Sequence, residues 1–564
     1  MDDQSKPNLR EFLNEVSSFS EDEAQPAPAK APAPALGAIG KVVEIAGSGS
    51  QIRLDSAAVT TLQSHKDPSV AMSGQVGSQI KTVVGNSWLI ANVRTLRAGE
   101  TGELVAHVDF LGEGSRDSTG RMTNFRRGVT RYPIPGADVL PVTTEDLRSI
   151  FAASDEPHIE IGTVYPTDDI RGALYVDPML GKHFAVLGST GTGKSTSVSL
   201  ILHRISELSP EGHIVMIDPH GEYSAAFKGC GELFNVDNLQ LPYWLMNFEE
   251  HCEVMLTTHD AERQRDADIL AKCLLAARTK GKDMSQYGKV TVDSPLPYLL
   301  ADLNGIIVNE MGKLERAGDT LPYQRLKTKL DELRADPRYT FMFSGMLVSD
   351  TLASLLAKMF RLPSHGKPIS IVDVSGVPSE VTSVVVSVLA RMVFDYAIWS
   401  RTEAQRPLLL VCEEAHRYVP KDESAESGQA VRKILERIAK EGRKYGVSLG
   451  LITQRPSDLA EGVLSQCGTI ISMRLNNDRD QACVRAAMPE GARGFLDAIP
   501  ALRNRECIVC GEGVAIPIRV RFDDLEPEKR PASSDPSFAR LWRETGDEEG
   551  IIQRTIKRWR GHGR

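Results

Sequence analysis

One nine-residue stretch, GSTGTGKST at residues 188–196, constrains the fold of this chain more than any other feature. It follows the apolar run HFAVLG, which is typical of a buried strand, and it precedes VSLILHRI, which is typical of a buried helix. The stretch matches the phosphate-binding loop pattern G-x-x-x-x-G-K-[ST], which joins a strand to a helix. The sequence therefore predicts an α/β fold whose sheet presents a phosphate-binding loop.

The residue types in this loop suit a bound nucleoside triphosphate. Glycines let the backbone wrap closely around a phosphate and direct several N–H groups at it. Lys194 adds a positive charge near the β- and γ-phosphates, Ser195 is a candidate Mg²⁺ ligand, and the N-terminus of the following helix favours an anion. The predicted nucleotide-binding residues are Gly188, Thr190, Gly191, Thr192, Gly193, Lys194, Ser195 and Thr196.

Size and composition favour a soluble protein of more than one domain. The chain has 564 residues, whereas single cores stop growing beyond roughly 250–300 residues. It contains no continuous apolar run of the length that spans a membrane, and its N-terminus has no signal-peptide pattern, so we expect a cytoplasmic location and no membrane segment. The net charge of −9 argues against a surface coated in positive charge. A ring-shaped motor can nevertheless line a narrow channel with Lys and Arg while its outside stays acidic.

The eight cysteines are scattered through apolar segments, which is typical of reduced, buried cysteine. Cys507 and Cys510 form a single C-x-x-C pair, without a second pair at ligand spacing. We therefore predict two residues of a buried strand at this place rather than a zinc site.

The chain divides into four predicted regions. Residues 1–36 end in alternating Ala and Pro, which predicts a disordered arm and linker. Residues 37–145 contain short β-type runs between turns, which predicts a small β-barrel or sandwich. From 146 to 525, apolar strand runs alternate with helices, which predicts a parallel-rich sheet with a helical insertion at about 248–345. Residues 526–564 are polar, and we expect a tail or an inter-subunit arm. The candidate strands of the sheet are residues 183–188, 213–218, 369–375, 408–413, 448–453, 469–475, 506–511 and 515–522.

Two adjacent acids, Glu413 and Glu414, follow the predicted strand in PLLLVCEEAHRYVP. In hydrolases with a phosphate-binding loop, the first acid of such a pair holds Mg²⁺ through water and the second polarises the attacking water. Glu413 is therefore the second candidate metal residue, beside Ser195, and Glu414 is the candidate general base. The first acid is more often Asp, so Glu413 carries its carboxylate one methylene further from the strand.

Gln454 and Arg443 complete the predicted catalytic set. Gln454 ends the strand run in LITQRPSDL, where it can contact the γ-phosphate or orient the attacking water. An ordinary turn at a strand end is the alternative interpretation. Arg443 lies in the basic cluster ERIAKEGRKYG and is the candidate arginine finger for a neighbouring subunit. Basic residues also favour helix C-termini, and the competing finger candidates are Lys444, Arg455 and Arg474.

A polar loop, IDPHGEYS, follows the second predicted strand. It carries Asp218, His220 and Glu222, and it should lie at the same edge of the sheet as the nucleotide. The spacing of these residues matches no strong metal-site pattern. We interpret the segment as a structural or nucleotide-coupling loop.

Seven segments, in this order, make the chain resemble the HerA family within the HerA–FtsK group of ring ATPases. They are GSTGTGKST, DPHGEY, TVDSPLPY, DPRYTFMF, CEEAHRYVP, EGRKYG and ITQRPSDL. The resemblance implies a RecA-like P-loop ATPase core over residues 160–522 and an N-terminal β-barrel over residues 37–142. It also implies a homo-hexamer that uses ATP and Mg²⁺ to move double-stranded DNA through a central channel.

The same resemblance implies roles and partners. Lys194 would bind phosphate, Glu414 would activate water, Gln454 would sense the nucleotide and Arg443 would act in the neighbouring subunit. The Glu–Glu pair at 413–414 resembles bacterial members of the group. Members usually act beside a partner enzyme, which can be a nuclease in DNA end processing, or a nuclease or sirtuin-like NADase in anti-phage defence.

Three functions compete on these observations. The first is an ATP-driven DNA translocase or helicase. The second is an ATP-dependent scaffold ring that assembles and activates a partner effector with little translocation of its own. The third is a pump for protein or conjugative DNA, a class that often carries membrane segments. DNA-stimulated ATP turnover with a steep salt dependence separates the first from the second.

Overall fold

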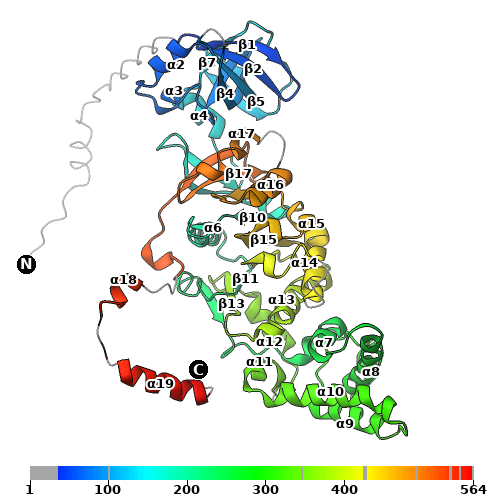
Figure 1. The fold of residues 1–564 in the computed structure, drawn as a ribbon. Helices are drawn as coiled ribbons and strands as arrows, with labels where there is room; N and C mark the ends of the chain where they lie inside the picture. The colour runs from blue at the N-terminus through cyan, green and yellow to red at the C-terminus, as the bar shows by residue number, and fades with distance from the viewer. Residues whose placement is uncertain are drawn as a thin grey trace, which may run out of the picture.

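The computed structural model describes most of the chain after the N-terminal arm. The described residues are 36–99, 102–344, 347–422, 428–488, 493–532, 537–544, 546 and 548–561. The predicted arm at residues 1–36 lies outside them, apart from Leu36. The molecule consists of a small β-barrel, a large mixed sheet covered by helices, and a helical segment beyond the sheet (Figure 1).

The N-terminal strands close into the predicted barrel. Six of them follow the order β2-β1-β7-β3-β4-β5, and a pairing of β2 with β5 completes the ring, while β6 extends it beside β5. Neighbouring strands are antiparallel, and alternate side chains such as Ile52, Val93 and Val108 fill the interior. The strands are β1 (Gly40–Ile45), β2 (Gly49–Leu54), β3 (Gln79–Val84), β4 (Ser87–Ala98), β5 (Leu104–Arg116), β6 (Met122–Arg127) and β7 (Asp138–Pro141).

The large sheet has the strand order β12-β13-β11-β14-β15-β10-β16-β17-β18-β8-β9. The strands from β12 to β16 in this order are parallel, and those from β17 to β9 are antiparallel. The phosphate-loop strand β10 lies between β15 and β16, one strand away from β14, which carries the paired acids. The strands are β8 (His158–Val164), β9 (Arg171–Tyr175), β10 (Phe184–Leu187), β11 (Ile214–Asp218), β12 (Gly231–Phe234), β13 (Ile369–Asp373), β14 (Leu408–Cys412), β15 (Val447–Thr453), β16 (Thr469–Ser472), β17 (Glu506–Gly511) and β18 (Ile518–Phe522).

All eight predicted strands of this sheet form, but one of them, β17, runs opposite to the parallel sheet that its apolar run predicted. Strand β17 is as apolar and buried as the parallel strands, yet it pairs antiparallel with β16 and β18. Only six residues join β17 to β18, which is too short for a parallel crossover. Burial on both faces of the sheet therefore explains why β17 is apolar, and the short connection to β18 explains why it runs antiparallel. Strands β8, β9 and β12 were not predicted.

Helices cover both faces of the large sheet and extend beyond it. Between β12 and β13 lies the predicted helical insertion, which begins at α7 and continues past residue 345 to the end of α12 (Figure 1). The helices are α2 (Ser56–Leu62), α3 (Pro68–Ala71), α4 (Thr144–Phe151), α5 (Val176–Gly181), α6 (Lys194–Leu208), α7 (Phe248–Met255), α8 (Asp260–Thr279), α9 (Leu300–Met311), α10 (Ala317–Ala335), α11 (Thr340–Phe343), α12 (Leu352–Met359), α13 (Ser379–Trp399), α14 (Gln429–Glu441), α15 (Glu461–Leu464), α16 (Asp478–Ala487), α17 (Arg493–Leu496), α18 (Phe538–Leu541) and α19 (Glu548–Gly561).

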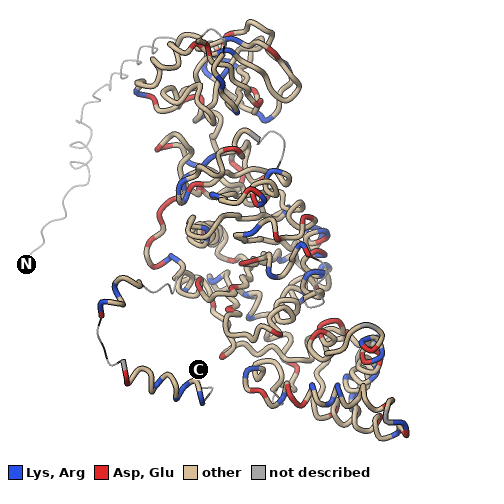
Figure 2. Tube along the Cα trace, in the orientation of Figure 1, with Lys and Arg blue, Asp and Glu red and all other residues tan. Residues whose placement is uncertain are grey.

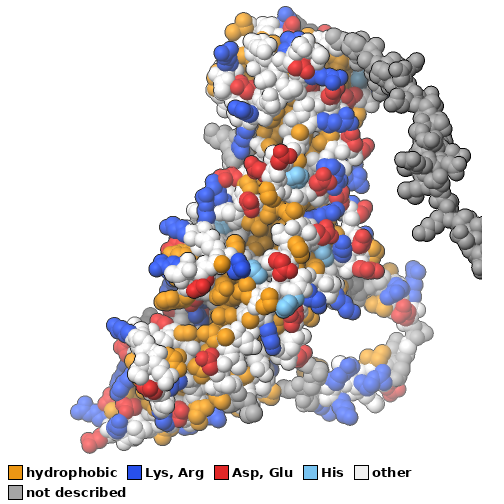
Figure 3. All heavy atoms as spheres, turned by 180° about the vertical axis from the view of Figure 1, so that it is seen from behind, with side chains coloured by type: hydrophobic (Ala, Val, Ile, Leu, Met, Phe, Trp, Pro, Cys, Tyr) orange, Lys and Arg blue, Asp and Glu red, His pale blue; other side chains and the backbone are white. Residues whose placement is uncertain are grey.

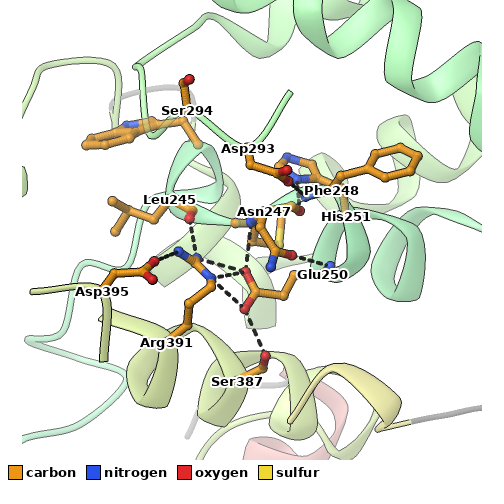
Figure 4. Close-up of polar contacts among 12 residues, drawn as sticks. Leu245, Asn247, Phe248, Glu250, His251, Asp293, Ser294, Ser387, Arg391 and Asp395 are labelled. Atoms are coloured by element: carbon orange, nitrogen blue, oxygen red, sulfur yellow. Dashed lines mark hydrogen bonds and ion pairs between the residues drawn. The ribbon is translucent and has the colours of Figure 1, made fainter. Parts of the chain in front are cut away.

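A buried ion pair attaches the helical insertion to the core helix α13 (Figure 4). Arg391 of α13 donates hydrogen bonds to both oxygens of Glu250 in α7, and its Nη2 lies 2.9 Å from Oε2. The Ser387 hydroxyl and the Asn247 backbone N–H also donate to the same carboxylate. Glu250 is fully buried, so these donors replace the water that its charge has lost.

Helix α13 is the one helix in the described part of the chain that has to be distinguished from a membrane span. By length and composition alone it is apolar enough to cross a membrane, although the continuous sequence contains interrupting polar residues. In the fold, 67% of its apolar window is buried, and Val385, Leu389 and Phe394 belong to the main core. Core helices of this kind have the same composition as membrane spans.

Candidate nucleotide site

Backbone geometry at the loop between β10 and α6 requires glycine. Gly191 and Gly193 have φ of +78° and +95°, a region that residues with a Cβ rarely adopt. At Gly188, a Cβ would lie 2.9 Å from Cβ of Met473, so a larger residue would collide with Met473. Helix α6 then begins at Lys194, and its first N–H groups point into the loop. The curved loop and the helix N-terminus fit a phosphate chain, which is the group that the sequence predicted here.

Lys194 lies between the two predicted acids. Its Nζ is 2.9 Å from Oε1 of Glu413 and 3.7 Å from Oε1 of Glu414, and its side chain is only 8% exposed. Burial opposes the charge on Lys194, but the two carboxylates outweigh burial and raise the pKa of the ammonium. Burial likewise raises the pKa of the Glu413 carboxyl, and Lys194 partly offsets this effect. The lysine is thus charged and has carboxylates in the place where phosphate oxygens would compete for it.

The hydroxyl of Tyr223 lies close to both candidate metal residues. It donates a 3.0 Å hydrogen bond to Oε2 of Glu413, and the side chain of Ser195 is near enough to affect its pKa. A hydroxyl and a carboxylate so close together are a donor set that Mg²⁺ accepts, with water and phosphate oxygens completing its shell. Sequence reasoning quoted the segment DPHGEY but did not assign a role to its tyrosine. Its position directly after the acidic loop was the available signal.

The loop that carries Tyr223 is held by Asp218. The two carboxylate oxygens of Asp218 accept hydrogen bonds from the backbone N–H groups of His220, Gly221 and Tyr223, at 3.1, 2.9 and 2.9 Å. The carbonyl of Glu222 accepts from the N–H of Ala532 in the C-terminal segment. These contacts agree with the structural interpretation of the loop. Within the described ranges, no three His, Cys, Asp or Glu side chains are arranged to hold a metal ion.

Glu414, the second residue beyond strand β14, has an unusual backbone conformation. Its φ of +52° lies in the left-handed region, and its side chain is 7% exposed. Among the described residues, its Oε2 has no hydrogen-bond partner, although Nδ1 of His416 lies 3.2 Å away. That ring nitrogen instead shares a 2.9 Å hydrogen bond with the hydroxyl of Thr453. Burial is the main cause that lowers the pKa of His416, so the imidazole is neutral near pH 7.

Gln454 follows strand β15 and contacts the phosphate loop directly. Its Oε1 accepts a 2.5 Å hydrogen bond from the hydroxyl of Thr190, and the carbonyl of Thr453 accepts from the N–H of Gly188. Because β10, β14 and β15 are parallel neighbours in one sheet, their carboxyl ends bring Lys194, Glu414 and Gln454 to a single edge. We call it the carboxyl edge.

Arg443 lies at the other end of the same strands. It is an exposed residue of the turn Gly442–Tyr445, which leads into β15, and it borders a cavity of about 900 Å³. The first residues of β11, β14 and β15 line the same cavity, namely Ile214, Leu408 and Val447. We call this side of the sheet the amino edge. Arg443 is therefore not brought together with Lys194 of its own chain.

The competing basic residues occupy different places. Lys444 is exposed beside Arg443 at the amino edge. Arg474 lies next to the phosphate loop of its own chain, where its carbonyl accepts from the N–H of Ser189 and its guanidinium bonds to Asn504. Arg455 is exposed and lies 3.7 Å from Asp458. Of the four candidates, Arg443 and Lys444 are the two that lie at the amino edge, away from the phosphate loop of their own chain.

The C-x-x-C pair has the predicted structural role. Cys507 and Cys510 are both buried in strand β17 and are not disulfide-bonded. Burial raises the pKa of the Cys510 thiol to about 12, which keeps it protonated and unreactive.

Comparisons with known proteins agree with this geometry. Residues 159–393 match the family model described as the central domain of helicase HerA. The DNA double-strand break repair helicase HerA of Pyrococcus furiosus is 26% identical over 494 residues, which cover 81% of this chain and 83% of that protein. The helicase of the same name from Sulfolobus acidocaldarius is 25% identical over 432 residues, which cover 76% and 80%. Among solved structures, VirB4 of Thermoanaerobacter pseudethanolicus aligns over 67% of this chain and 99% of that chain, with a TM-score of 0.48 and 16% identity. The chain is therefore a P-loop ATPase that is similar to HerA helicases over most of its length.

Proposed function

We propose that this chain is an ATP-driven translocase or helicase for double-stranded DNA, and that it works as a homo-hexamer. The observation that carries the proposal is the separation of the catalytic residues. Lys194, Glu414 and Gln454 meet at the carboxyl edge, whereas Arg443 is exposed at the amino edge. A ring in which the amino edge of one copy faces the carboxyl edge of the next would complete every site, and it would couple hydrolysis to movement between subunits.

In this proposal each residue acts on a defined part of bound ATP. The phosphate loop and Lys194 would hold the β- and γ-phosphates, and Ser195 and Glu413 would hold Mg²⁺, which would neutralise part of the phosphate charge. Glu414 accepts a proton from the attacking water. Gln454 contacts the γ-phosphate or orients that water. The guanidinium of Arg443 from the adjacent copy stabilises the charge that spreads over the γ-phosphate in the transition state.

The surface of the chain supports an assembly of several copies. The cavity at the amino edge has a mainly apolar lining that includes Val176, Leu180 and Ile205, and a space-filling view shows apolar atoms in a band along one face below the barrel (Figure 3). Helix α19 lies apart from the rest of the chain, with Trp559 78% exposed. Lys and Arg recur along it (Figure 2). Exposed apolar groups of this size favour contacts with other chains.

The basic residues of α14 do not by themselves indicate a DNA channel. Arg432 lies 2.9 Å from Glu436, and Arg437 lies 3.7 Å from Glu441, so acids on the same helix balance these charges. Lys433 pairs with Glu249 of the helical insertion. Pairing of this kind is typical of a solvated helix face.

The test is ATP turnover by the purified chain, with and without linear double-stranded DNA, over a range of salt concentrations. Stimulation by DNA that fades as salt rises supports the translocase, because Lys and Arg contacts to phosphates release counterions on binding. Turnover that is indifferent to DNA at every salt concentration contradicts it and favours the scaffold ring. Native mass spectrometry of the same sample tests the hexamer.

We further propose a cytoplasmic location and a partner effector, either a nuclease or a sirtuin-like NADase, in DNA end processing or anti-phage defence. The support is the family and the similarity to helicases named for double-strand break repair. Co-expression with each effector class, followed by assay of nuclease or NAD hydrolysis activity, tests the partner. An effector whose activity is the same with and without this chain would contradict the proposal.

A further inference from the structure

His416 joins the end of one strand to the acid at the end of the next. Its Nδ1 lies 2.9 Å from the hydroxyl of Thr453, the last residue of β15, and 3.2 Å from Oε2 of Glu414, which follows β14. The Thr453 hydroxyl also accepts a 3.0 Å hydrogen bond from the N–H of Arg455, which fixes the position of its oxygen. Thr453 is completely buried, so this position is set by the sheet rather than by solvent.

Among the described residues, Oε2 of Glu414 has no hydrogen-bond partner, and the contact between His416 and Thr453 accounts for this. A buried carboxylate oxygen without a donor is unfavourable and is seldom found in a folded protein. Here, Nδ1 of His416 is close enough to satisfy Oε2 but is directed at Thr453 instead. Nδ1 of the neutral ring lies near two possible partners, the Thr453 hydroxyl and Oε2 of Glu414. Because Nδ1 bonds to Thr453, Oε2 of Glu414 remains open to accept a proton from water.

The carboxyl end of β15 also contacts the phosphate loop. Gln454, the residue after Thr453, accepts a 2.5 Å hydrogen bond from the hydroxyl of Thr190. A series of contacts therefore connects the phosphate loop to the end of β15. It continues from the Thr453 hydroxyl to the imidazole of His416, which lies beside Glu414. The left-handed backbone of Glu414, with φ of +52°, is a further sign that the acid is held in a particular orientation.

We propose that His416 is a positioning residue, held by Thr453, that keeps the carboxylate of Glu414 oriented and its Oε2 open for the attacking water. The inference rests on the proposed role of Glu414 as general base. Neither His416 nor Thr453 has to touch the nucleotide for this purpose. Their removal should therefore slow turnover while nucleotide binding is retained.

The experiment compares four variants of the full chain: His416→Ala, Thr453→Val, the double variant and Thr453→Ser. Valine keeps the shape of threonine without the hydroxyl, and serine keeps the hydroxyl. The measurements are kcat and KM for ATP, the affinity for mant-ADP by fluorescence, and the melting temperature. His416→Ala and Thr453→Val should each lower kcat roughly 10- to 100-fold, because a small displacement of a catalytic group has an effect of that size. KM and mant-ADP affinity should stay within about twofold.

Two features separate positioning from a purely structural role. Thr453→Ser should keep kcat close to that of the unmodified chain, and the double variant should be no slower than the slower single variant, because both changes break one link. Unchanged kcat in Thr453→Val would overturn the proposal, and so would a double variant whose loss is the product of the two single losses. If His416→Ala does not fold, the Thr453→Val and Thr453→Ser pair still decides the outcome.

Glu414→Gln distinguishes failure of this inference from failure of the general-base assignment. If Glu414→Gln still hydrolyses ATP at the normal rate, the base assignment is wrong and the inference falls with it. If Glu414→Gln is inactive while Thr453→Val has a normal kcat, only the positioning role of His416 is wrong.

Discussion

The two edges of the large sheet differ in how complete they are. At the carboxyl edge, Lys194 is buried between two carboxylates, Tyr223 bonds to Glu413, and Gln454 bonds to the phosphate loop. At the amino edge, Arg443 is exposed beside an open cavity of about 900 Å³. Contacts within the chain organise the carboxyl edge, whereas the amino edge leaves Arg443 exposed, as the proposed contact between copies requires.

The largest expected effect is at the carboxyl edge. Lys194→Ala should abolish ATP turnover, because it removes the positive charge that the phosphates require and leaves two buried acids without their cation. ATP turnover and melting temperature measured together check this. The matched control is Lys182→Ala, just before β10 at the amino edge, where the lysine is partly exposed and should be dispensable. Normal turnover in Lys194→Ala would show that the assignment of the nucleotide site to the carboxyl edge is wrong.

Arg443→Ala should lower turnover roughly 1,000-fold if Arg443 acts as a finger for an adjacent copy. Nucleotide affinity should change little, since the residue lies far from the phosphate loop of its own chain. Lys444→Ala, at the exposed neighbour that is the competing candidate, should remain active, and loss of turnover in Lys444→Ala alone would make Lys444 the finger instead.

A mixing experiment tests whether the amino edge of one copy acts on the carboxyl edge of another. Arg443→Ala chains and Glu414→Gln chains, combined after dissociation, should regain activity. Some interfaces would then pair an intact finger with an intact acid. If the mixture is no more active than the separate variants, Arg443 does not act between copies.

Glu414→Gln should lower turnover roughly 100- to 1,000-fold while ATP still binds, because the amide cannot accept the proton of water. Binding of mant-ADP and single-turnover hydrolysis, measured on the same preparation, check this. Loss of binding instead would make Glu414 a structural or metal residue, and Glu413 would then be the better base candidate.

The smallest expected effect concerns Tyr223→Phe. Removal of the hydroxyl that donates to Glu413 should lower activity roughly 10-fold and raise the Mg²⁺ concentration needed for half-maximal rate. A Mg²⁺ titration of turnover measures the shift, with Tyr132→Phe in the barrel as control, since that hydroxyl bonds only to the carbonyl of Gly47 in the described contacts. An unchanged Mg²⁺ requirement would show that Tyr223 supports the fold alone.

Much of the fold could be predicted because it depends on local patterns. The phosphate loop, the apolar strand runs and the paired acids are contiguous in sequence, and each reflects backbone geometry or burial that its own residues require. Strands β8 and β9 were missed because they are only partly apolar, with burial that alternates along them. The direction of β17 was missed because burial on both faces gives parallel and antiparallel central strands the same composition.

By itself, the sequence determined that a strand, a glycine loop and a helix would hold phosphate, and that acids would follow another strand, since these features require only neighbours in the chain. The tertiary structure decided which strands lie side by side. It placed β15 between β10 and β14, and so brought Gln454 to the loop and Thr453 to His416. It also placed Arg443 at the opposite edge. Contacts of this kind join residues far apart in the chain, and strand order, which no local pattern encodes, decides them.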